Sequence, residues 1–375
     1  MEDVMEEKAR LILEDGTQFI GVGFGSNRTA IVELVFNTSM VGYQEILSDP
    51  SYTDQAVVMT YPLIGNYGIN EDDYETKTPT ISGFVVRDYN DEPSNFRSKQ
   101  SLGDVMKTYD VVGISGVDTR KITRHIRTYG SCKAMITRED EEKLPLQKAV
   151  NLLKEYKLLT DAVSRVSTKV CYTLGDKEKA SFHVVAIDCG IKYNILRMLE
   201  KKGCFITVVP WNTSAKEILS LSPDGVFISN GPGDPMDVQA TIDTIRELIG
   251  RVPIFGICLG HQIISLAYHA KTYKLKFGHR GGNHPVKNLL TDKIEMTSQN
   301  HSYAVDTASV ADTKLEITHV NLLDQTVEGV RCKADFVSSV QYHPESAPGP
   351  VDSVYLFDGF LQMMSEWKEG EMKNA

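Results

Sequence analysis

One cysteine stands in a setting that suits nucleophilic chemistry. Residues Gly256–Gly260 read Gly-Ile-Cys-Leu-Gly, follow an apolar run and precede a helical pattern. A sharp turn from strand to helix brings neighbouring backbone close, so flanking glycines avoid Cβ clashes and let the Cys258 thiol project from the sheet edge. The N-terminus of the next helix would favour the thiolate. The pentad predicts a reactive cysteine; the alternative is a buried structural cysteine beside two turn glycines.

A candidate base for this thiol lies near the carboxyl end. His343 ends a strand-like run that begins at Phe336, and Pro344 and Glu345 follow it. Proline biases the residue before it toward an extended conformation, and residues two apart on an extended chain point the same way. We therefore expect Glu345 to orient the imidazole that His343 offers to Cys258, as the third member of a catalytic triad does. The alternative is a surface His-Pro-Glu turn.

The loop Ser229–Pro235 is a third candidate element. It reads Ser-Asn-Gly-Pro-Gly-Asp-Pro and directly follows an apolar strand that ends near Ile228. Backbone N–H groups of Gly231 and Leu259 could together hold the oxyanion of a tetrahedral intermediate, at about 3 kcal/mol per donor. The loop lacks the G-x-G-x-x-G pattern and holds two prolines, which argues against dinucleotide binding. Read alone, it is a glycine and proline turn.

The first 150 residues predict strands. Arg10–Leu13 and Gln18–Val22 flank an Asp15-Gly16 pair that suits a tight hairpin turn. Further strands are expected at Ile31–Phe36, Ala56–Thr60 and Ile81–Val86. Residues 1–150 are therefore expected to form a β-rich domain, and 151–181, which begin with an amphipathic helix and end in a polar run, to form a linker region.

From residue 182 to 375 the pattern alternates between short apolar strands and helices. The expected strands are His183–Asp188, Phe205–Val209, Val226–Ser229 and Pro253–Ile257, and the expected helices are Tyr193–Lys202, Val238–Ile249 and His261–Tyr268. This rhythm predicts an α/β domain with a mainly parallel sheet that is covered on both faces. In such sheets, sites form where strands end and loops cross to the next helix.

Composition narrows the function classes. A chain of 375 residues with 41% hydrophobic residues suggests two globular domains. The net charge of −10 argues against broad attraction to nucleic acid or an anionic membrane. No run approaches the roughly 18 apolar residues of a membrane span, and the start Met1–Glu7 is acidic, so the cytoplasm is the expected compartment. The six cysteines show no C-x-x-C or zinc-like spacing, so we predict no metal site.

Taken together, three motifs resemble the class I, or triad, glutamine amidotransferases: the loop at 230–235, the run Gly256–Gln262 and the run Tyr342–Glu345. Four further stretches resemble the small (glutamine amidotransferase) subunits of carbamoyl phosphate synthetases. They are Phe36–Tyr52, Tyr61–Gly68, Gly116–Arg120 and Lys276–Pro285. The resemblance covers nearly the whole chain. Without it, Gly278–Gly282 would read as a flexible loop.

The resemblance implies that L-glutamine is held at the junction of the two domains. Carried over residue by residue, the implied contacts come from Ser51, Gly231, Gly233, Leu259, Gln262, Asn300, Ser302 and Tyr303. The better-known family pattern has Gly and Phe where Ser302 and Tyr303 stand here. We expect those two positions to use backbone groups, which tolerate the change.

The resemblance also implies the reaction. The Cys258 thiolate would attack the glutamine side-chain amide, His343 would protonate the departing ammonia, and water would release glutamate from a thioester. Ammonia would then pass through a channel to a large partner subunit, which uses ATP and Mg to make carbamoyl phosphate from bicarbonate for arginine and/or pyrimidine synthesis. The assembly would be a heterodimer or several heterodimers. No cofactor is expected in this chain, which also lacks a Walker-type phosphate loop.

Two alternatives remain open at this point. Another triad amidotransferase is one, although such enzymes are not expected to carry this amino-terminal domain. An inactive regulatory scaffold of the large subunit is the other. The intact Cys258, His343 and Glu345 argue against it, because relatives without glutaminase activity include some that have lost the cysteine.

Overall fold

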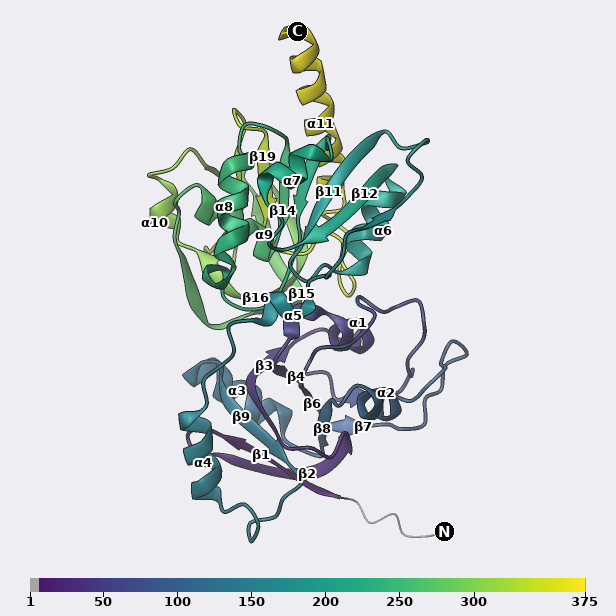
Figure 1. Cartoon of the computed structure of the whole chain (residues 1–375). Helices are drawn as coiled ribbons and strands as arrows, with labels where there is room; N and C mark the ends of the chain where they lie inside the picture. Colours follow the sequence, from purple (N-terminus) through teal and green to yellow (C-terminus); the bar gives the residue numbers. More distant parts are fainter. Residues whose placement is uncertain (1–6, 375) are drawn as a thin grey trace. The chain divides into compact units, whose positions relative to one another are not determined.

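The computed structural model describes residues 7–374 and divides into two compact units, Met1–Leu159 and Thr160–Ala375 (Figure 1). The division falls inside the segment 151–181 that was predicted as a linker region. The acidic start of the chain, apart from Glu7, lies outside the described residues.

The first unit is built on a closed barrel, as its β-rich sequence predicts. Its strands follow one another in the order β1 (Lys8–Leu13), β2 (Gln18–Gly25), β8 (Val112–Ser115), β6 (Gly83–Val85), β4 (Gln55–Met59), β3 (Ala30–Asn37) and β9 (Cys132–Thr137). The predicted hairpin joins β1 and β2, and Gly16 takes the positive φ of 89° that its turn needs. β5 (Leu63–Ile64) and β7 (Asp88–Tyr89) pair separately.

The helices of the first unit are α1 (Tyr43–Ser48), the 3-10 turn η1 (Pro50–Tyr52), α2 (Leu102–Thr108), α3 (Thr119–Tyr129) and α4 (Leu146–Glu155). The amphipathic helix expected to open the linker region is α4, which starts earlier than predicted. Its apolar face, with Ala149, Val150 and Leu153, packs on Ile12 and Met135 of the barrel. Because this face needs the barrel to bury it, the helix belongs to the first unit.

The second unit contains a ten-stranded sheet. Its order is β10 (Tyr172–Leu174), β12 (Cys204–Pro210), β11 (Phe182–Asp188), β13 (Gly225–Ile228), β14 (Ile254–Ile257), β19 (Val337–Val340), β18 (Val327–Cys332), β16 (Lys293–Val305), β15 (Thr272–Asn288) and β17 (Glu316–Asn321). Only the run from β12 to β19 is parallel, and every other pairing is antiparallel.

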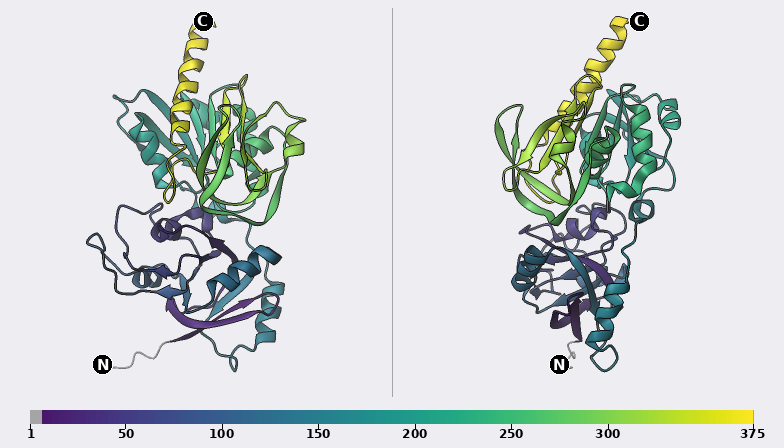
Figure 2. Two further views of the ribbon diagram at one scale, coloured as in Figure 1. Left: turned by 180° about the vertical axis from the view of Figure 1, so that it is seen from behind. Right: turned by 90° about the vertical axis from the view of Figure 1, so that its left-hand side faces the viewer.

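The prediction of a mainly parallel sheet is therefore right for the centre of the sheet and wrong for its flank. The flank is dominated by the long hairpin of β15 and β16 (Figure 2). Residues Gly278–Gly282, which would read as a flexible loop if taken by themselves, lie within β15. The pairing shifts register between Lys274 and His279 and again between Gly281 and His284, and these irregularities hide the alternation typical of a strand.

Helices cover both faces of the parallel strands, as the sequence predicts. α7 (Ala215–Ser220), α8 (Gln239–Leu248) and α9 (Leu259–Ala267) lie on one face, and α6 (Tyr193–Lys201) and α11 (Tyr355–Asn374) on the other. In β11, Val185 and Ile187 face the first group, while Val184 and Ala186 face the second. Each fully buried valine or isoleucine stabilises the fold by about 1.5–3 kcal/mol. The short elements α5 (Ala162–Val166), η2 (Pro235–Val238) and α10 (Thr307–Val310) complete the unit.

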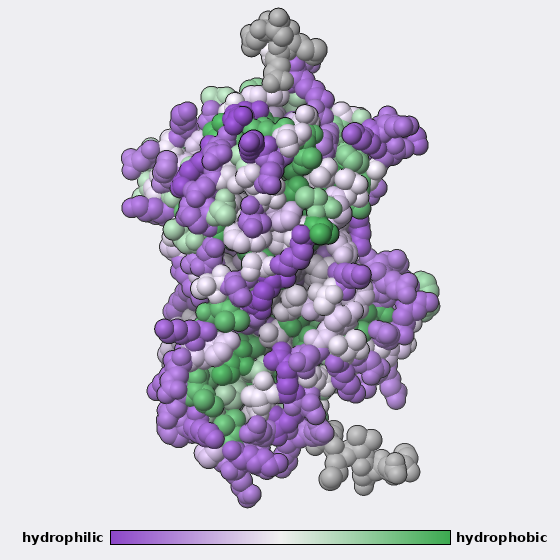
Figure 3. All heavy atoms as spheres, viewed as in Figure 1, coloured by the Kyte–Doolittle hydropathy of each residue, from purple (hydrophilic) through white to green (hydrophobic). Residues whose placement is uncertain are grey.

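The surface is largely hydrophilic on the face shown in Figure 3, with apolar residues in smaller groups between polar ones. Within the described part of the chain, no helix combines the length and the apolar character that crossing a membrane requires. The longest helix, α11, is amphipathic: Phe357, Phe360 and Met364 are buried against the sheet, whereas Tyr355 is 42% exposed.

Candidate active site

Cys258 stands at the carboxyl end of β14, directly before the first residue of α9. Its backbone has φ 56° and ψ −104°, a conformation that costs a non-glycine residue about 1–3 kcal/mol. The turn is held by hydrogen bonds from the Cys258 N–H to the Val340 carbonyl at 2.9 Å and from the Gln262 N–H to the Cys258 carbonyl at 3.2 Å. The strand therefore breaks abruptly into the helix at the sulfur-bearing residue, as the pentad predicts.

The two glycines of the pentad are required by close packing. A Cβ on Gly256 would lie 2.8 Å from the carbonyl carbon and oxygen of Gly260. A Cβ on Gly260 would lie 2.3 Å from the carbonyl oxygen of Ile228 on β13. Real Cβ atoms do not approach backbone this closely, so the turn excludes side chains at positions 256 and 260. This confirms the role that the sequence assigns to these glycines.

The fold brings His343 to the same edge of the sheet as Cys258. β14 and β19 are parallel neighbours, with Ile257 opposite Val340, so the segments that follow them leave the sheet side by side. His343 is held by a hydrogen bond from its N–H to the Ser298 carbonyl at 2.9 Å. Carboxyl ends of adjacent parallel strands are where active sites of such sheets form.

Glu345 contacts the imidazole of His343, with Nδ1 2.7 Å from Oε1. The contact is the predicted one, but the predicted route to it is wrong. His343 opens a turn in which the Ser346 N–H donates to the His343 carbonyl at 3.1 Å, so Glu345 reaches back across a turn and not along an extended chain. Both side chains are buried, with exposures of 2% and 0%.

The electrostatics favour an ion pair between a protonated His343 and an ionised Glu345. Burial alone would lower the pKa of His343, but its interactions with Glu345 and then with Cys258 raise the pKa to about 10. Burial would raise the pKa of Glu345, but the Lys192 ammonium and the His343 imidazole lower the pKa to about 2. His343 Nε2 has no hydrogen-bond partner among the described residues, and the Cys258 thiol faces the Asn300 carbonyl at 3.5 Å. The imidazole nitrogen is thus available to a sulfur or a substrate.

Lys192 is a functional candidate that the sequence did not reveal. Its Nζ donates to Glu345 Oε1 at 2.9 Å and to the Ser346 carbonyl at 2.8 Å, and its side chain is only 3% exposed. It lies in the loop after β11, where the Asp188 carboxylate accepts from the Ile191 N–H at 2.8 Å. Its place after a central parallel strand is the one signal that could have found it, because loops at that edge form sites.

The loop after β13 packs against the strand-to-helix turn at Cys258. A Cβ on Gly231 would lie 2.8 Å from a methyl of Leu259 and 2.1 Å from the Cys189 carbonyl oxygen, so the Gly231 backbone packs directly beside the first residue of α9. Gly233 has a φ of 89° and open space around it. The Asn230 side chain accepts from the Lys192 N–H at 3.1 Å, which ties this loop to the Lys192 loop.

The other predicted glutamine contacts fall into two groups. Gln262, Asn300, Ser302 and Tyr303 belong to the second unit, and Gln262 Nε2 donates to the Tyr303 carbonyl at 2.9 Å. Ser302 Oγ accepts from Arg280 Nη2 at 2.5 Å, so its side chain is engaged with a neighbouring strand. Ser51 belongs to the first unit, in η1, where its N–H donates to Asp49 Oδ1 at 2.8 Å.

Comparison with known proteins places both halves of the chain. Residues 11–136 match the family described as carbamoyl-phosphate synthase small chain, CPSase domain, and residues 185–363 match glutamine amidotransferase class-I. The carbamoyl phosphate synthase small chain of Staphylococcus haemolyticus is 53% identical, over 98% of this chain and 99% of its own length. The small chain of Bacillus cereus is also 53% identical, over 97% of this chain and 98% of its own length. The chain therefore belongs to the carbamoyl phosphate synthase small chain family.

Proposed function

We propose that this chain is the glutamine-hydrolysing subunit of a carbamoyl phosphate synthase. It converts L-glutamine to glutamate and passes the ammonia to a large chain that makes carbamoyl phosphate from bicarbonate. One observation carries the chemical part: a cysteine in a strained strand-to-helix turn shares a sheet edge with a buried histidine, whose far nitrogen contacts a buried glutamate at 2.7 Å. The near full-length likeness to carbamoyl phosphate synthase small chains supports the rest.

The first half of the reaction uses the Cys258 thiolate and the proton on His343. The Cys258 sulfur forms a bond to the side-chain carbonyl carbon of glutamine, and the carbonyl becomes an oxyanion. His343 gives its proton to the amide nitrogen, the C–N bond breaks, and ammonia leaves while a γ-glutamyl thioester remains on Cys258. The raised pKa of His343 keeps that proton on the imidazole before attack.

The second half regenerates the thiolate. His343, now neutral, takes a proton from water as the hydroxyl attacks the thioester carbon. The C–S bond then breaks, glutamate leaves, and the thiolate again faces the imidazolium. Glu345 holds the ring orientation throughout, because its Oε1 contacts Nδ1 and leaves Nε2 toward the reacting groups.

Backbone N–H groups are proposed to stabilise the oxyanion in both halves. Gly231 packs against Leu259, so their two N–H groups are candidates for one oxyanion hole. We propose that Gly233, Gln262, Asn300, Ser302 and Tyr303 hold the glutamine. Ser51 remains a proposed contact on the family resemblance alone.

The nucleotide chemistry is proposed to reside in the partner. The relatives are named small chains, which implies a large chain beside them. We propose that this partner uses ATP and Mg, that this chain needs no cofactor of its own, and that the complex is a heterodimer or an assembly of heterodimers. We further propose a cytoplasmic enzyme whose product serves arginine or pyrimidine synthesis.

Co-purification tests the proposal. The full chain, tagged and expressed in its source cell, should bring down a large chain, and the complex should make carbamoyl phosphate from bicarbonate and ATP with glutamine as nitrogen donor. Glutamate should form in step with carbamoyl phosphate. A complex that used free ammonia and ignored glutamine would instead favour the inactive regulatory scaffold.

A further inference from the structure

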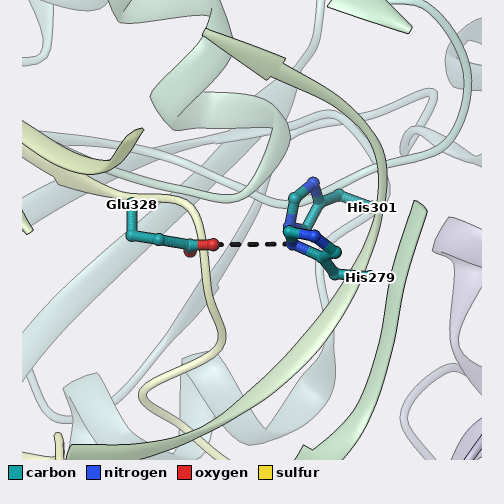
Figure 4. A group of neighbouring side chains, drawn as sticks. All are labelled: His279, His301 and Glu328. Carbon is teal, nitrogen blue, oxygen red and sulfur yellow. Dashed lines mark ion pairs between the residues drawn. The ribbon is translucent and has the colours of Figure 1, made fainter. Parts of the chain in front are cut away.

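A second histidine and glutamate cluster lies in the same unit and takes no part in the chemistry above. His279 on β15 and His301 on β16 are opposite one another, and Glu328 on β18 points toward them (Figure 4). Their exposures are 6%, 5% and 0%. Buried ionisable groups destabilise a fold unless they are paired, so a group of three needs an explanation.

Glu328 is the centre of this cluster. Its Oε1 lies 3.6 Å from His279 Nδ1 and accepts from Asn321 Nδ2 at 3.1 Å. Its Oε2 accepts from Gln299 Nε2 at 3.0 Å. Because a buried carboxylate holds such donors strongly, its position fixes the side chain of Gln299.

The contacts continue from Gln299 along β16. Gln299 Oε1 lies 3.0 Å from His301 Nε2, and His301 Nδ1 lies 2.7 Å from the Tyr303 carbonyl oxygen. That carbonyl also accepts from Gln262 Nε2. Burial lowers the pKa of His301 well below its usual value, so the ring is neutral and donates its one N–H in only one of these two contacts. Gln299 and His301 flank Asn300, whose carbonyl accepts from the Cys258 thiol.

Most of the atoms that could ligate a metal ion in this cluster are already engaged, so an ion would have to break several contacts to bind. His279 Nδ1 is the exception: it lies 3.6 Å from Glu328 Oε1 and has no hydrogen-bond partner among the described residues. His279 Nε2 lies 2.8 Å from Asp324 Oδ2, and both nitrogens of His301 face carbonyl oxygens. Burial would lower the pKa of His279, but its contacts with Asp324 and Glu328 raise the pKa to about 9. A protonated His279 therefore supplies the positive charge that the two carboxylates require.

We propose that Glu328, paired with His279, is a positioning residue for glutamine: through Gln299 and His301 it holds the backbone of residues 299–303 in the geometry that binds substrate beside Cys258. Side chains alternate between the two faces along β16, which links the anchored residues to the proposed glutamine contacts. Gln299 and His301 point to the anchored side, while Asn300 and Ser302, two proposed glutamine contacts, point to the other side. This inference rests on the proposed function, because it identifies Glu328 as the residue that orients the proposed glutamine-binding segment.

Glu328→Gln tests this role, because it keeps the shape and removes the charge. In the complex with the large chain, we expect the KM for glutamine to rise about tenfold and kcat to change by less than about twofold, since a charged hydrogen-bonded anchor is lost and the reacting groups stay. Ammonia-dependent carbamoyl phosphate synthesis should not change. A purely structural role would lower the unfolding temperature and leave KM alone.

Glu295→Gln is the matched control. Glu295 is a buried carboxylate on the same strand, β16, and accepts from Ser353 Oγ at 2.6 Å and Tyr355 Oη at 2.7 Å. Its loss should leave the KM for glutamine at the wild-type value. An equal rise of KM in both variants would overturn the proposal, because the effect would then belong to any buried charge on β16.

The double variant His279→Asn/Glu328→Gln covers the case in which Glu328→Gln does not fold, since it removes both members of the buried pair. The carboxylate that loses its partner, Asp324, is 40% exposed and can be solvated. It should fold and still show the raised KM. A wild-type KM for glutamine in either folded variant would contradict the proposal. Wild-type complex and Cys258→Ala are run alongside: if the wild type released no glutamate, or Cys258→Ala still did, the proposed function itself would fail, which is a different result.

Discussion

Two histidine and glutamate pairs in the second unit share their chemistry and differ in one respect. Glu345 contacts His343 through Nδ1, and the opposite nitrogen has no hydrogen-bond partner among the described residues. Glu328 faces His279, whose opposite nitrogen is held by Asp324 at 2.8 Å. Both imidazoles have raised pKa values and both pairs are buried. One pair leaves a nitrogen for reaction, and the other has both nitrogens facing carboxylates.

The difference shows that burial, charge and a carboxylate neighbour do not identify a catalytic histidine. What separates the pairs is the neighbour of the second nitrogen. For His343 it is the strained Cys258 turn, whereas for His279 it is another acid. We propose that the first arrangement transfers protons and that the second holds a charge that positions nearby backbone.

The largest effect on glutamine hydrolysis is expected when the Cys258 sulfur is removed. Cys258→Ala should abolish glutamine hydrolysis and leave ammonia-dependent synthesis by the complex intact, because no other group forms the thioester. Cys204→Ala, at a buried cysteine on β12, is the control and should keep full glutaminase activity. Glutamate release is measured in both. Retained hydrolysis in Cys258→Ala would remove the nucleophile from the mechanism.

His343→Ala should lower kcat by roughly 10²–10⁴, the range for loss of a general acid and base, with the fold intact. His279→Asn should instead raise the KM for glutamine and leave kcat nearly unchanged. Steady-state glutamine kinetics of the two variants separate these outcomes. Equal falls in kcat would mean that the two histidines do not have the different roles assigned to them.

Lys192→Leu should have a smaller effect on turnover and a marked effect on stability. It removes the ammonium that contacts Glu345 Oε1 and leaves this buried carboxylate with the His343 imidazole as its remaining charged contact. Breaking a buried pair by removing one partner costs about 3–5 kcal/mol. The free energy of unfolding from urea titration measures this. Adding Glu345→Gln to the variant should recover part of the loss, and a further fall of the same size would contradict the pairing.

The smallest effect is expected in how the free energy of unfolding depends on pH. The pKa values of His279 and His343 are raised from 6.5 to about 9 and about 10 in the folded state, so folding strengthens proton binding at both. Their contribution to stability is full below about pH 6.5 and is lost as the pH rises toward 9 and 10. The free energy of unfolding should therefore fall between pH 6.5 and 10. The slope should be shallower in His279→Asn, and an unchanged slope would mean that His279 does not hold its proton.

Sequence alone predicted the parts of the site that lie in short motifs. The glycines around Cys258 and the His343-Pro344-Glu345 run are local, and the structure brings His343 and Glu345 into contact. The turn that makes this contact was not foreseen, because the effect of Pro344 is on the residue before it and says nothing of the chain after it.

Groups that meet only through folding were missed. Lys192 and Glu345 are 153 positions apart, and nothing local to either announces a buried ion pair. Glu328 shows the same difficulty, because its partners come from β15, β16 and β17. The antiparallel flank of the sheet was missed for a related reason: bulges in β15 break the period of two on which strand prediction relies.

Trapping the acyl intermediate tests the central claim most directly. The complex is mixed with glutamine, quenched in acid during turnover and digested, and the peptides of all six cysteines are weighed by mass spectrometry. The account predicts a γ-glutamyl adduct on Cys258 alone, which disappears when glutamine is consumed. Glutamate formation with no adduct on Cys258, or with an adduct on another cysteine, would contradict it.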